Sequence, residues 1–546
     1  MRFDVRRAAV VAAIVGLVAA SPGGAGAQTV PSYDKVSFAQ PEVDVDRLTA
    51  GIHMTKDETA PTRGFAGPAS MAVSPENPRV IAAATANLRT RLCHLLVSTD
   101  AGQTWHFSEE RPAAETYPNC TSGIAGVPQS SLAWGSDGTL YYASMAYGEG
   151  EGPREGVTSI ALARTTDLGE SWTTTIVHDA RAQPDPKPED TGVTALAVDT
   201  SGDQDTVYVG FSQTWRRSTE EGHPLNEKQD VVVSVSTDGG ETFAEPVSLN
   251  EQSELTMTFG GESYPLHFQT AFGRPFMTVH DGVVLAVADG GPPNDDEPPE
   301  EVFDGIFGEA LPMLVGRSTD QGRTWTVSEL SPPVFNAVGS HTGMGWTPEG
   351  GPDGTFVFAY AATPGDTPSA GRSDIVVQRS TDRGMTWTEP LAINDDDPSD
   401  DYSHFYPQLD VAPNGRVDVV WQDNRNLTDY LMNVQYTYST DGGVTWAPNQ
   451  AVTDRPVDFN FGISFNSDIR QGPGVASTDE YAFIGWADPR FADEETQTQD
   501  NFGVVAQFSP LPAEGNPTLR ILAAILGGLL VAGLLLLLLQ AMRRRA

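Results

Sequence analysis

One eight-residue pattern recurs six times along the chain and constrains the fold more than any other feature. Each copy has Ser or Thr first, Thr second, Asp third, Gly fifth and an aromatic residue last. The copies begin at Ser98, Thr165, Ser236, Ser318, Ser380 and Ser439. Successive copies lie roughly 60 to 80 residues apart, a spacing that indicates a repeat architecture.

Each copy has the composition of a tight turn between two strands, and we call it a box turn. In the fifth copy, an alternating segment at 374–379 predicts the strand that leads in. Asp382 is placed to accept hydrogen bonds from turn amides, and Gly384 to adopt a positive φ. Trp387 then starts the following strand with a large apolar side chain.

The sequence around each box turn predicts four short strands. In the sixth unit these are 407–412, 416–422, 432–438 and the segment from Trp446. A seventh unit begins near Ser467, but it has no box turn and no room for a fourth strand. An open ring would expose edge strands, so we expect the N-terminal stretch 33–40, or the one near Ile52, to supply that strand.

The box turns resemble the Asp boxes of the sialidase-like, or BNR-repeat, β-propeller family. The resemblance implies an all-β propeller of four-stranded blades over residues 28–515. The repeat count predicts seven blades, while sialidases have six, so six remains an alternative. The resemblance also implies that the box aspartates are structural. These are Asp100, Asp167, Asp238, Asp320, Asp382 and Asp441.

Both ends of the chain differ from this body. Residues 1–27 have a basic start, an apolar centre and a small-residue cleavage site, which predicts a signal peptide. An apolar run at 521–539 predicts a transmembrane helix within 516–540, and the basic tail 541–546 should stay cytoplasmic. We therefore expect a single-pass cell-surface protein whose N-terminal domain is extracellular.

A second interpretation of the C-terminus stays open. Residues 511–515 resemble the sortase sorting signal of Gram-positive bacteria, but Glu514 stands where that signal has the Thr at which the chain is cut. The sequence alone leaves sortase processing undecided.

The net charge of the chain limits the classes of partner that it can bind. The 73 acidic residues against 33 basic ones give a formal net charge of −40, which disfavours nucleic acid. Acidic runs at 294–297 and 394–401 are candidates for Ca²⁺, although neither has EF-hand spacing and solvated loops are the alternative. No cofactor is required by this interpretation.

Candidate ligand-binding residues gather where the second strands of several units end. A Trp-x-Asp-x-Arg pattern ends this strand in units six and seven. Arginine side chains match carboxylates in paired hydrogen bonds, so such a ring suits an acidic sugar. The candidates are Arg425, Arg490, Asp423, Asp488, His404, Tyr406, Arg89 and Arg91. The alternative is that each pattern is a repeat feature in which Asp and Arg bridge neighbouring loops.

The two cysteines, Cys93 and Cys120, lie in unit one and in the loop that leads to unit two. In an exported protein a disulfide between them is plausible, and two free buried thiols are the alternative.

The resemblance leaves the activity open. A retaining exo-α-sialidase uses three arginines, an acid/base Asp and a Tyr activated by Glu. Sialidases also carry a Phe/Tyr-Arg-Ile-Pro motif, yet the corresponding stretch here is 62–68 and lacks it. We therefore expect recognition of extracellular carbohydrate or protein ligands. Glycoside hydrolysis of the exo-α-sialidase type is the first alternative, and a scaffold in a membrane-bound assembly is the second.

Overall fold

The structure is a computed structural model in which the following residues are described: 33–39, 43–56, 63–68, 70–90, 92–113, 117, 119–121, 131–147, 159–183, 190–216, 227–259, 262–269, 275–291, 311–332, 335–336, 343–347, 355–363, 373–397, 402–427, 431–462 and 472–510. The predicted signal peptide (1–27), transmembrane segment (516–540) and basic tail (541–546) lie outside these ranges. Within them, no helix is long and apolar enough to cross a membrane.

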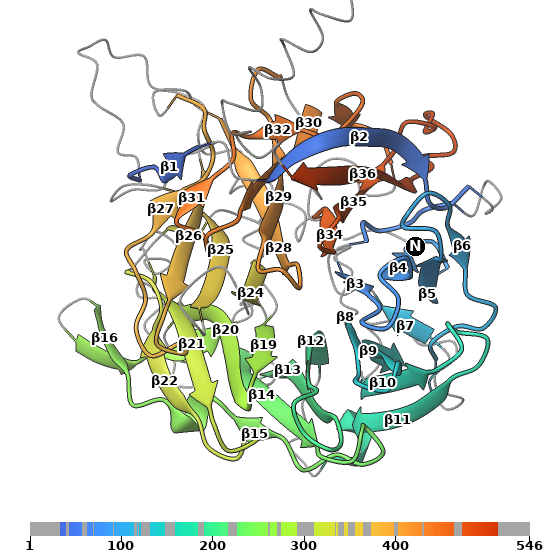
Figure 1. Ribbon diagram of the computed structural model, residues 1–546. Helices are drawn as coiled ribbons and strands as arrows, with labels where there is room; N and C mark the ends of the chain where they lie inside the picture. Colours follow the sequence, from blue (N-terminus) through green and yellow to red (C-terminus); the bar gives the residue numbers. More distant parts are fainter. Residues whose placement is uncertain are drawn as a thin grey trace, which may run out of the picture.

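Seven antiparallel sheets stand around a central axis like the blades of a propeller (Figure 1). The first strand of each blade lies innermost. Blades 1 to 3 consist of these strands: β3 (Ser70–Val73), β4 (Ile81–Asn87), β5 (Leu92–Ser98) and β6 (His106–Phe107); β8 (Ser131–Trp134), β9 (Leu140–Tyr147), β10 (Ser159–Thr165) and β11 (Thr173–His178); β12 (Asp190–Asp199), β13 (Thr206–Arg216), β14 (Glu227–Ser236) and β15 (Val247–Ser248).

Blades 4 to 6 repeat the plan. Their strands are β19 (Phe276–His280), β20 (Val283–Gly291), β21 (Met313–Ser318) and β22 (Thr326–Glu329); β24 (Gly343–Thr347), β25 (Thr355–Thr363), β26 (Asp374–Ser380) and β27 (Leu391–Ala392); β28 (His404–Val411), β29 (Val417–Asp423), β30 (Leu431–Ser439) and β32 (Gln450–Ala451).

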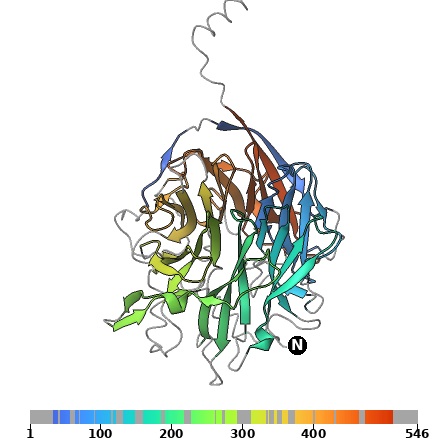
Figure 2. The same ribbon diagram turned by 60° about the horizontal axis from the view of Figure 1, so that its bottom comes forward.

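Short strands, one hairpin and two turns are added to the four-stranded blades. In blades 2, 4 and 5, β7 (Asn119–Thr121), β18 (His267–Gln269) and β23 (Phe335–Asn336) pair with the same second strand as the inner strand. Strand β33 (Val457–Asp458) pairs with β30, and the hairpin β16 (Thr256–Phe259) to β17 (Glu262–Pro265) projects from the side of the ring (Figures 1 and 2). Two 3₁₀ turns lie at Ala180–Ala182 and Asn250–Gln252.

The seventh blade is completed by the N-terminus of the chain. It consists of β34 (Gly474–Ser477), β35 (Tyr481–Asp488), β36 (Asp500–Pro510) and, at its outer edge, β2 (Val43–His53). Strand β2 pairs antiparallel with β36 from Val43 opposite Pro510 to His53 opposite Phe502. The prediction of seven blades closed by an N-terminal strand is confirmed, and the strand is the one near Ile52.

The other N-terminal candidate, 33–40, has a different place. Lys35 bridges Ala392 of blade 5, and β1 (Ser37–Phe38) pairs in parallel with β31 (Thr445–Trp446) of blade 6. Residues 33–39 and 43–53 therefore lie along the outside of blades 5, 6 and 7 (Figure 1). We call these two segments together the N-terminal strap.

The box turns share one hydrogen-bonding scheme. In the first, Ser98 Oγ donates to Asp100 Oδ1 (2.9 Å) and accepts from the Gly102 amide (2.9 Å). Asp100 also accepts from the amide (2.8 Å) and hydroxyl (2.7 Å) of Thr104. The same contacts recur in the other five copies. In each copy, the Asp carboxylate thus accepts hydrogen bonds from groups of its own turn. In the fifth copy, Gly384 has the predicted positive φ, 80°.

Arginines also link some box turns to one another. Arg164 and Arg379, each directly before a box turn, donate to the carbonyls of Gly239 (3.0 Å) and Gly442 (3.4 Å) in the next blade's turn. Arg317 contacts the Arg383 carbonyl (2.8 Å) in the same way. Neighbouring blades are therefore fastened along this rim.

The hydrophobic core lies between blades. Trp446, which ends the sixth box turn, is fully buried with Val357 and Ile375 of blade 5 and Val419 of its own blade. Its indole Nε1 donates to the Gly443 carbonyl (3.1 Å). By contrast, Trp387 and Trp172 are only partly buried.

Cys93, in β5, is buried and disulfide-bonded. The chain contains only one other cysteine, Cys120, and no described cysteine is free. The disulfide-bonded state of Cys93 agrees with the predicted disulfide between Cys93 and Cys120.

We expect Trp446→Ala to lower the free energy of unfolding by about 3 to 5 kcal/mol, because it leaves a cavity between blades 5 and 6. Trp387→Ala should cost less, because that side chain is partly exposed. Urea unfolding of the two variants checks the order. A smaller loss for Trp446→Ala than for Trp387→Ala would contradict this account of the core.

Candidate functional site

The Trp-x-Asp-x-Arg pattern forms a closed hydrogen-bonded unit at the end of β29. Trp421 Nε1 donates to Asp423 Oδ2 (3.1 Å), and the Arg425 amide donates to Asp423 Oδ1 (2.7 Å). The Arg425 guanidinium returns to Asp423 Oδ2 through Nε (2.8 Å). Asp423 is fully buried, so its two oxygens are held by its own strand end.

The end of β35 repeats this unit. Trp486 Nε1 donates to Asp488 Oδ2 (3.2 Å), and the Arg490 amide donates to Asp488 Oδ1 (2.8 Å). Arg490 Nη2 donates to Asp488 Oδ2 (2.6 Å), and the guanidinium lies over the ring of Phe502, 3.8 Å from its centre.

Both arginines also bind a carboxylate of the preceding blade. Arg425 Nη1 donates to Asp395 (2.6 Å), and Arg490 contacts Asp454 through Nη1 (3.1 Å) and Nη2 (2.8 Å). Burial alone would lower the arginine pKa values, but the aspartates raise them. The Arg425 guanidinium thus has three carboxylates of this chain within ion-pair distance, since Asp396 Oδ1 is 3.8 Å from its Nη2, and the Arg490 guanidinium has two. This is the arrangement that the alternative from the sequence describes.

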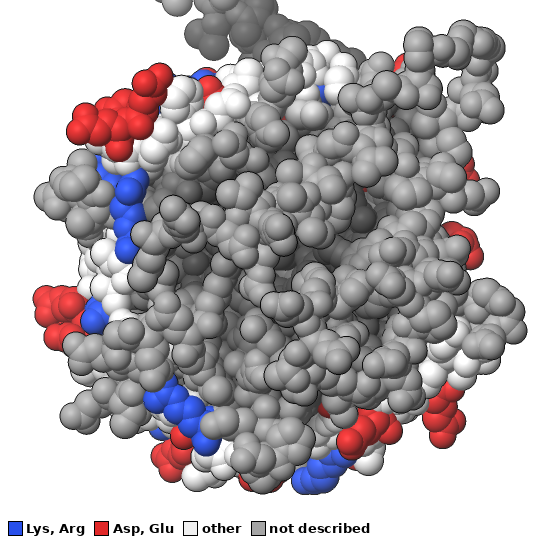
Figure 3. Space-filling model, turned by 180° about the vertical axis from the view of Figure 1, so that it is seen from behind, with Lys and Arg blue, Asp and Glu red and all other residues white. Residues whose placement is uncertain are grey.

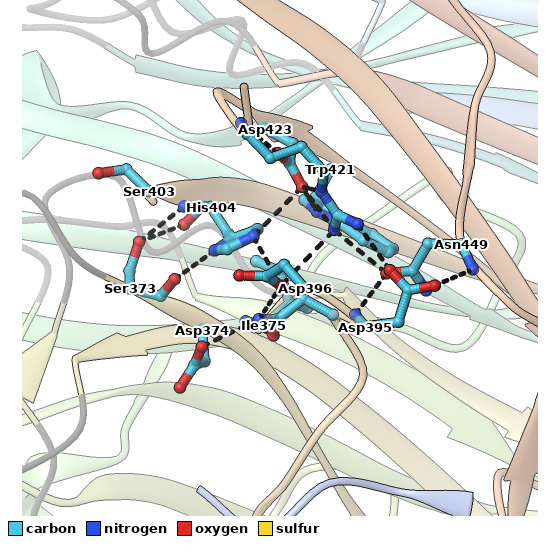
Figure 4. Close-up of polar contacts among 12 residues, drawn as sticks. Ser373, Asp374, Ile375, Asp395, Asp396, Ser403, His404, Trp421, Asp423 and Asn449 are labelled. Atoms are coloured by element: carbon cyan, nitrogen blue, oxygen red, sulfur yellow. Dashed lines mark hydrogen bonds and ion pairs between the residues drawn. The ribbon is translucent and has the colours of Figure 1, made fainter. Parts of the chain in front are cut away.

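His404 lies beside Asp423, the partner of Arg425 (Figure 4). The side chain is 1% exposed, and its Nε2 is 3.2 Å from Asp423 Oδ2 and 3.4 Å from Asp396 Oδ1. Its Nδ1 contacts the Ser373 carbonyl. Burial would lower the pKa of His404, but the charges of Asp423 and Asp396 and the hydrogen bonds to them raise it to about 10. The buried imidazolium therefore neutralises part of an acidic pocket.

The remaining candidates have different surroundings. Tyr406 is buried, with a φ of 54° at a bulge between Phe405 and Gln408, so its side chain is not offered to solvent. Arg91 lies outside the described residues. Of the acidic run 394–401, Asp395 and Asp396 are engaged with Arg425 and His404. Among the described residues, no group of acidic, His or Cys side chains is arranged to hold a metal. The run 294–297 is not described.

Arg89 departs from this scheme. It follows the end of β4 in the same register, but Asn87 stands where blades 6 and 7 have Asp. Asn87 Oδ1 accepts from the Arg89 amide (3.0 Å), as the aspartates do. The Arg89 guanidinium, however, binds only backbone carbonyls, those of Arg63 (3.3 Å), Gln497 (2.9 Å) and Thr496. Within the described part of the chain, Arg89 has no carboxylate partner, and it is exposed.

The backbone contact between Arg89 and Arg63 leads to two further side chains. Arg63 donates through Nε (2.7 Å) and Nη2 to the buried Asp500 of blade 7. Phe491 is 54% exposed, and its ring centre is 5.5 Å from the Arg63 guanidinium carbon. We call Arg63, Arg89 and Phe491 the Arg89 patch. The sequence singled out Arg89 by its place after a second strand, but it gave no sign that Arg63 and Phe491 meet there.

The centre of the ring offers little space among the described residues. The inner strands enclose a cavity of about 160 Å³ whose lining includes Ser70, Ser131, Gln408 and Asp410. Burial raises the pKa of Asp410 to about 7, and the nearby charge of Asp418 adds to this effect. The volume is below that of ordinary ligand pockets. The described charged side chains that are visible in Figure 3 lie around the rim of that face.

Comparison with known proteins gives a distant likeness in structure. No family model and no curated protein match the chain. Similar solved structures include a protein of unknown function from Dyadobacter fermentans (14% identity, 70% of this chain and 94% of that one, TM-score 0.42). They also include the Hadza microbial sialidase Hz136 (14%, 89% and 99%, 0.41) and an α-L-arabinanase from Penicillium chrysogenum (16%, 73% and 99%, 0.40). Likeness at this level does not distinguish one activity from another.

We expect Arg490→Ala to cost about 3 to 5 kcal/mol of folding stability, because it leaves the buried Asp488 carboxylate without its cation. Arg89→Ala removes no ion pair and should cost much less. The melting temperatures of the two variants test this contrast. Equal losses would mean that the carboxylate partners do not set the difference.

The stability supplied by ionised His404 should depend on pH in one direction. Because its pKa is raised above the ordinary value of about 6.5, the contribution is complete below that pH. It is lost progressively as pH rises through the folded-state value of about 10. Unfolding free energies of the wild type and His404→Gln, measured across this range, should therefore converge with rising pH. A constant difference would contradict a buried imidazolium.

Proposed function

We propose that the propeller is a recognition domain that binds an extracellular carbohydrate or protein ligand through a carboxylate of that ligand, at the Arg89 patch. We also propose that the box turns are Asp boxes of the sialidase-like type. In this proposal the domain is exported, and a C-terminal helix anchors it at the cell surface.

The observation that carries the proposal is the difference between the partners of three arginines that follow equivalent strand ends. Arg425 faces three carboxylates and Arg490 faces two, whereas Arg89 faces Asn87 and backbone carbonyls. In a chain of net charge −40, an exposed guanidinium without a carboxylate has its charge available for a ligand anion. The exposed ring of Phe491 adds an apolar surface on which a sugar ring or an apolar side chain can pack.

Recognition fits these residues better than sialidase-type hydrolysis. Sialidase chemistry uses three arginines on one carboxylate and a Tyr activated by Glu. Here, Arg425, Arg490 and Arg63 are each engaged by aspartates, and three of the described Tyr hydroxyls contact Asp. These are Tyr117 with Asp179, Tyr141 with Asp205 and Tyr436 with Asp418.

A glycan array tests the proposal, using residues 28–515 and acidic and neutral glycans, alongside a fluorogenic sialoside assay. We expect retention of carboxylate-bearing glycans without turnover. Arg89→Ala should weaken binding by roughly tenfold or more, the loss of one charge-assisted contact. Arg89→Lys should keep the charge but lose the paired geometry and restore binding only in part.

The matched control is Arg317→Ala on the opposite rim, a half-buried arginine that also binds a backbone carbonyl. It should leave affinity unchanged. Turnover of the sialoside would favour the hydrolase, and retention that is equal in the wild type and Arg89→Ala would remove the Arg89 patch from the binding site. Neither retention nor turnover would favour the scaffold in a membrane-bound assembly.

A further inference from the structure

The side-chain amide of Asn394, just after β27, is held on every side. The residue is 1% exposed. Its Oδ1 accepts from the Ile375 amide (3.0 Å), and its Nδ2 donates to Asp374 Oδ1 (2.9 Å) and Asp396 Oδ1 (2.8 Å). The carbonyl oxygen thus faces a backbone donor, while the nitrogen faces two carboxyl groups.

Asp374 has a second feature that packing alone does not explain. It is 3% exposed, and its Oδ2 has no hydrogen-bond partner among the described residues. A buried carboxylate oxygen without a partner is costly, because it has lost water and gained nothing in return. The charge of Asp374 also helps to raise the pKa of Tyr33, after burial, which places the N-terminal strap close to this carboxyl group.

The N-terminal strap brings a lysine to Asn394. Lys35 Nζ donates to the Asn394 carbonyl (2.8 Å) and to that of Asp396. The backbone holds it there, because the Val36 amide donates to the Ala392 carbonyl (3.0 Å) and the Ala392 amide donates to the Asp34 carbonyl (2.8 Å). In the described part of the chain, Lys35 has no carboxylate within ion-pair distance.

We propose that Lys35 and Asn394 form an intramolecular amide bond that ties the N-terminal strap to blade 5. The Lys35 amine, once deprotonated, attacks the side-chain carbonyl carbon of Asn394, and a bond forms between Nζ and Cγ. The bond between Cγ and Nδ2 breaks. One proton of the amine passes by way of the Asp374 carboxyl group to the leaving nitrogen, which departs as ammonia. Atoms and charge balance without an oxidant or any other reactant.

The surroundings favour each part of this exchange. The Ile375 amide stabilises the negative charge that develops on Oδ1, as a preorganised donor does in acyl transfer. The two carboxyl groups hold the leaving nitrogen, and burial of Asn394 limits competing attack by water. Strand pairing fixes Lys35 beside Asn394, so attack requires only that the amine move from the backbone carbonyl to the side-chain carbonyl of one residue.

The test is peptide mass spectrometry of the full-length protein after reduction and trypsin digestion. We expect one linked species that contains the Lys35 and Asn394 peptides, with the mass of their sum less one ammonia, and no cleavage after Lys35. Intact mass alone does not decide, because Gln28 at a mature N-terminus and the Asn394–Asp395 step can each lose ammonia by cyclisation.

Two variants make the assignment specific. Lys35→Arg keeps the positive charge and the contacts to the two carbonyls but cannot form this bond, so the linked species should be lost completely. Asp374→Asn keeps the shape of the pocket and should also abolish it. Cleavage after Lys35 together with an unlinked Asn394 peptide in the wild type would overturn the proposal. Since the wild-type digest gives that answer by itself, it does not depend on the variants folding.

Discussion

The pairing of β2 with β36 is the contact on which the ring depends. Without it, blade 7 would have three strands, and β36 would present a full row of unpaired backbone groups to solvent. The contact continues past the strand: the Met54 amide donates to the Asn501 carbonyl (2.9 Å), and Thr55 and Arg63 both bind Asp500. The start of blade 1 is thereby attached to the end of blade 7, and the Arg89 patch lies at that junction.

Arginines hold the seams at both ends of the blades, but in two chemical forms. Where a seam arginine meets backbone carbonyls, as Arg164, Arg317 and Arg379 do, the link between blades is a hydrogen bond to the backbone. Where it meets aspartates, as Arg425 and Arg490 do, the link is an ion pair with a carboxylate of the preceding blade. The arginine side chains thus link neighbouring blades in every case. Their positive charge is left for a ligand only where no carboxylate binds them.

The sequence predicted what depends on local chemistry. The box turns, their positive-φ glycines and the seven units follow from residues close together in the chain. The closing strand was narrowed to two segments, but nothing in the composition of 33–53 says which segment pairs with β36 and which crosses blades 5 and 6. The sequence predicted the candidate site less well than it predicted the fold. Whether Arg425 or Arg490 is free depends on Asp395 and Asp454, which belong to the preceding blade. The meeting of Arg63 with Phe491 joins opposite ends of the propeller.

The closure by β2 also has a consequence for the order of events in folding. The closing strand is made first and its partner almost last, so the final blade joins residues from both ends of the propeller. Such pairing carries a high contact order, and it must wait until synthesis of the whole ring is nearly complete. For a chain that emerges N-terminus first, β2 must remain unpaired while six blades form. Its sequence, VDVDRLTAGIH, places Asp44, Asp46 and Arg47 among the apolar residues, and such charges discourage a waiting strand from pairing with the wrong edge.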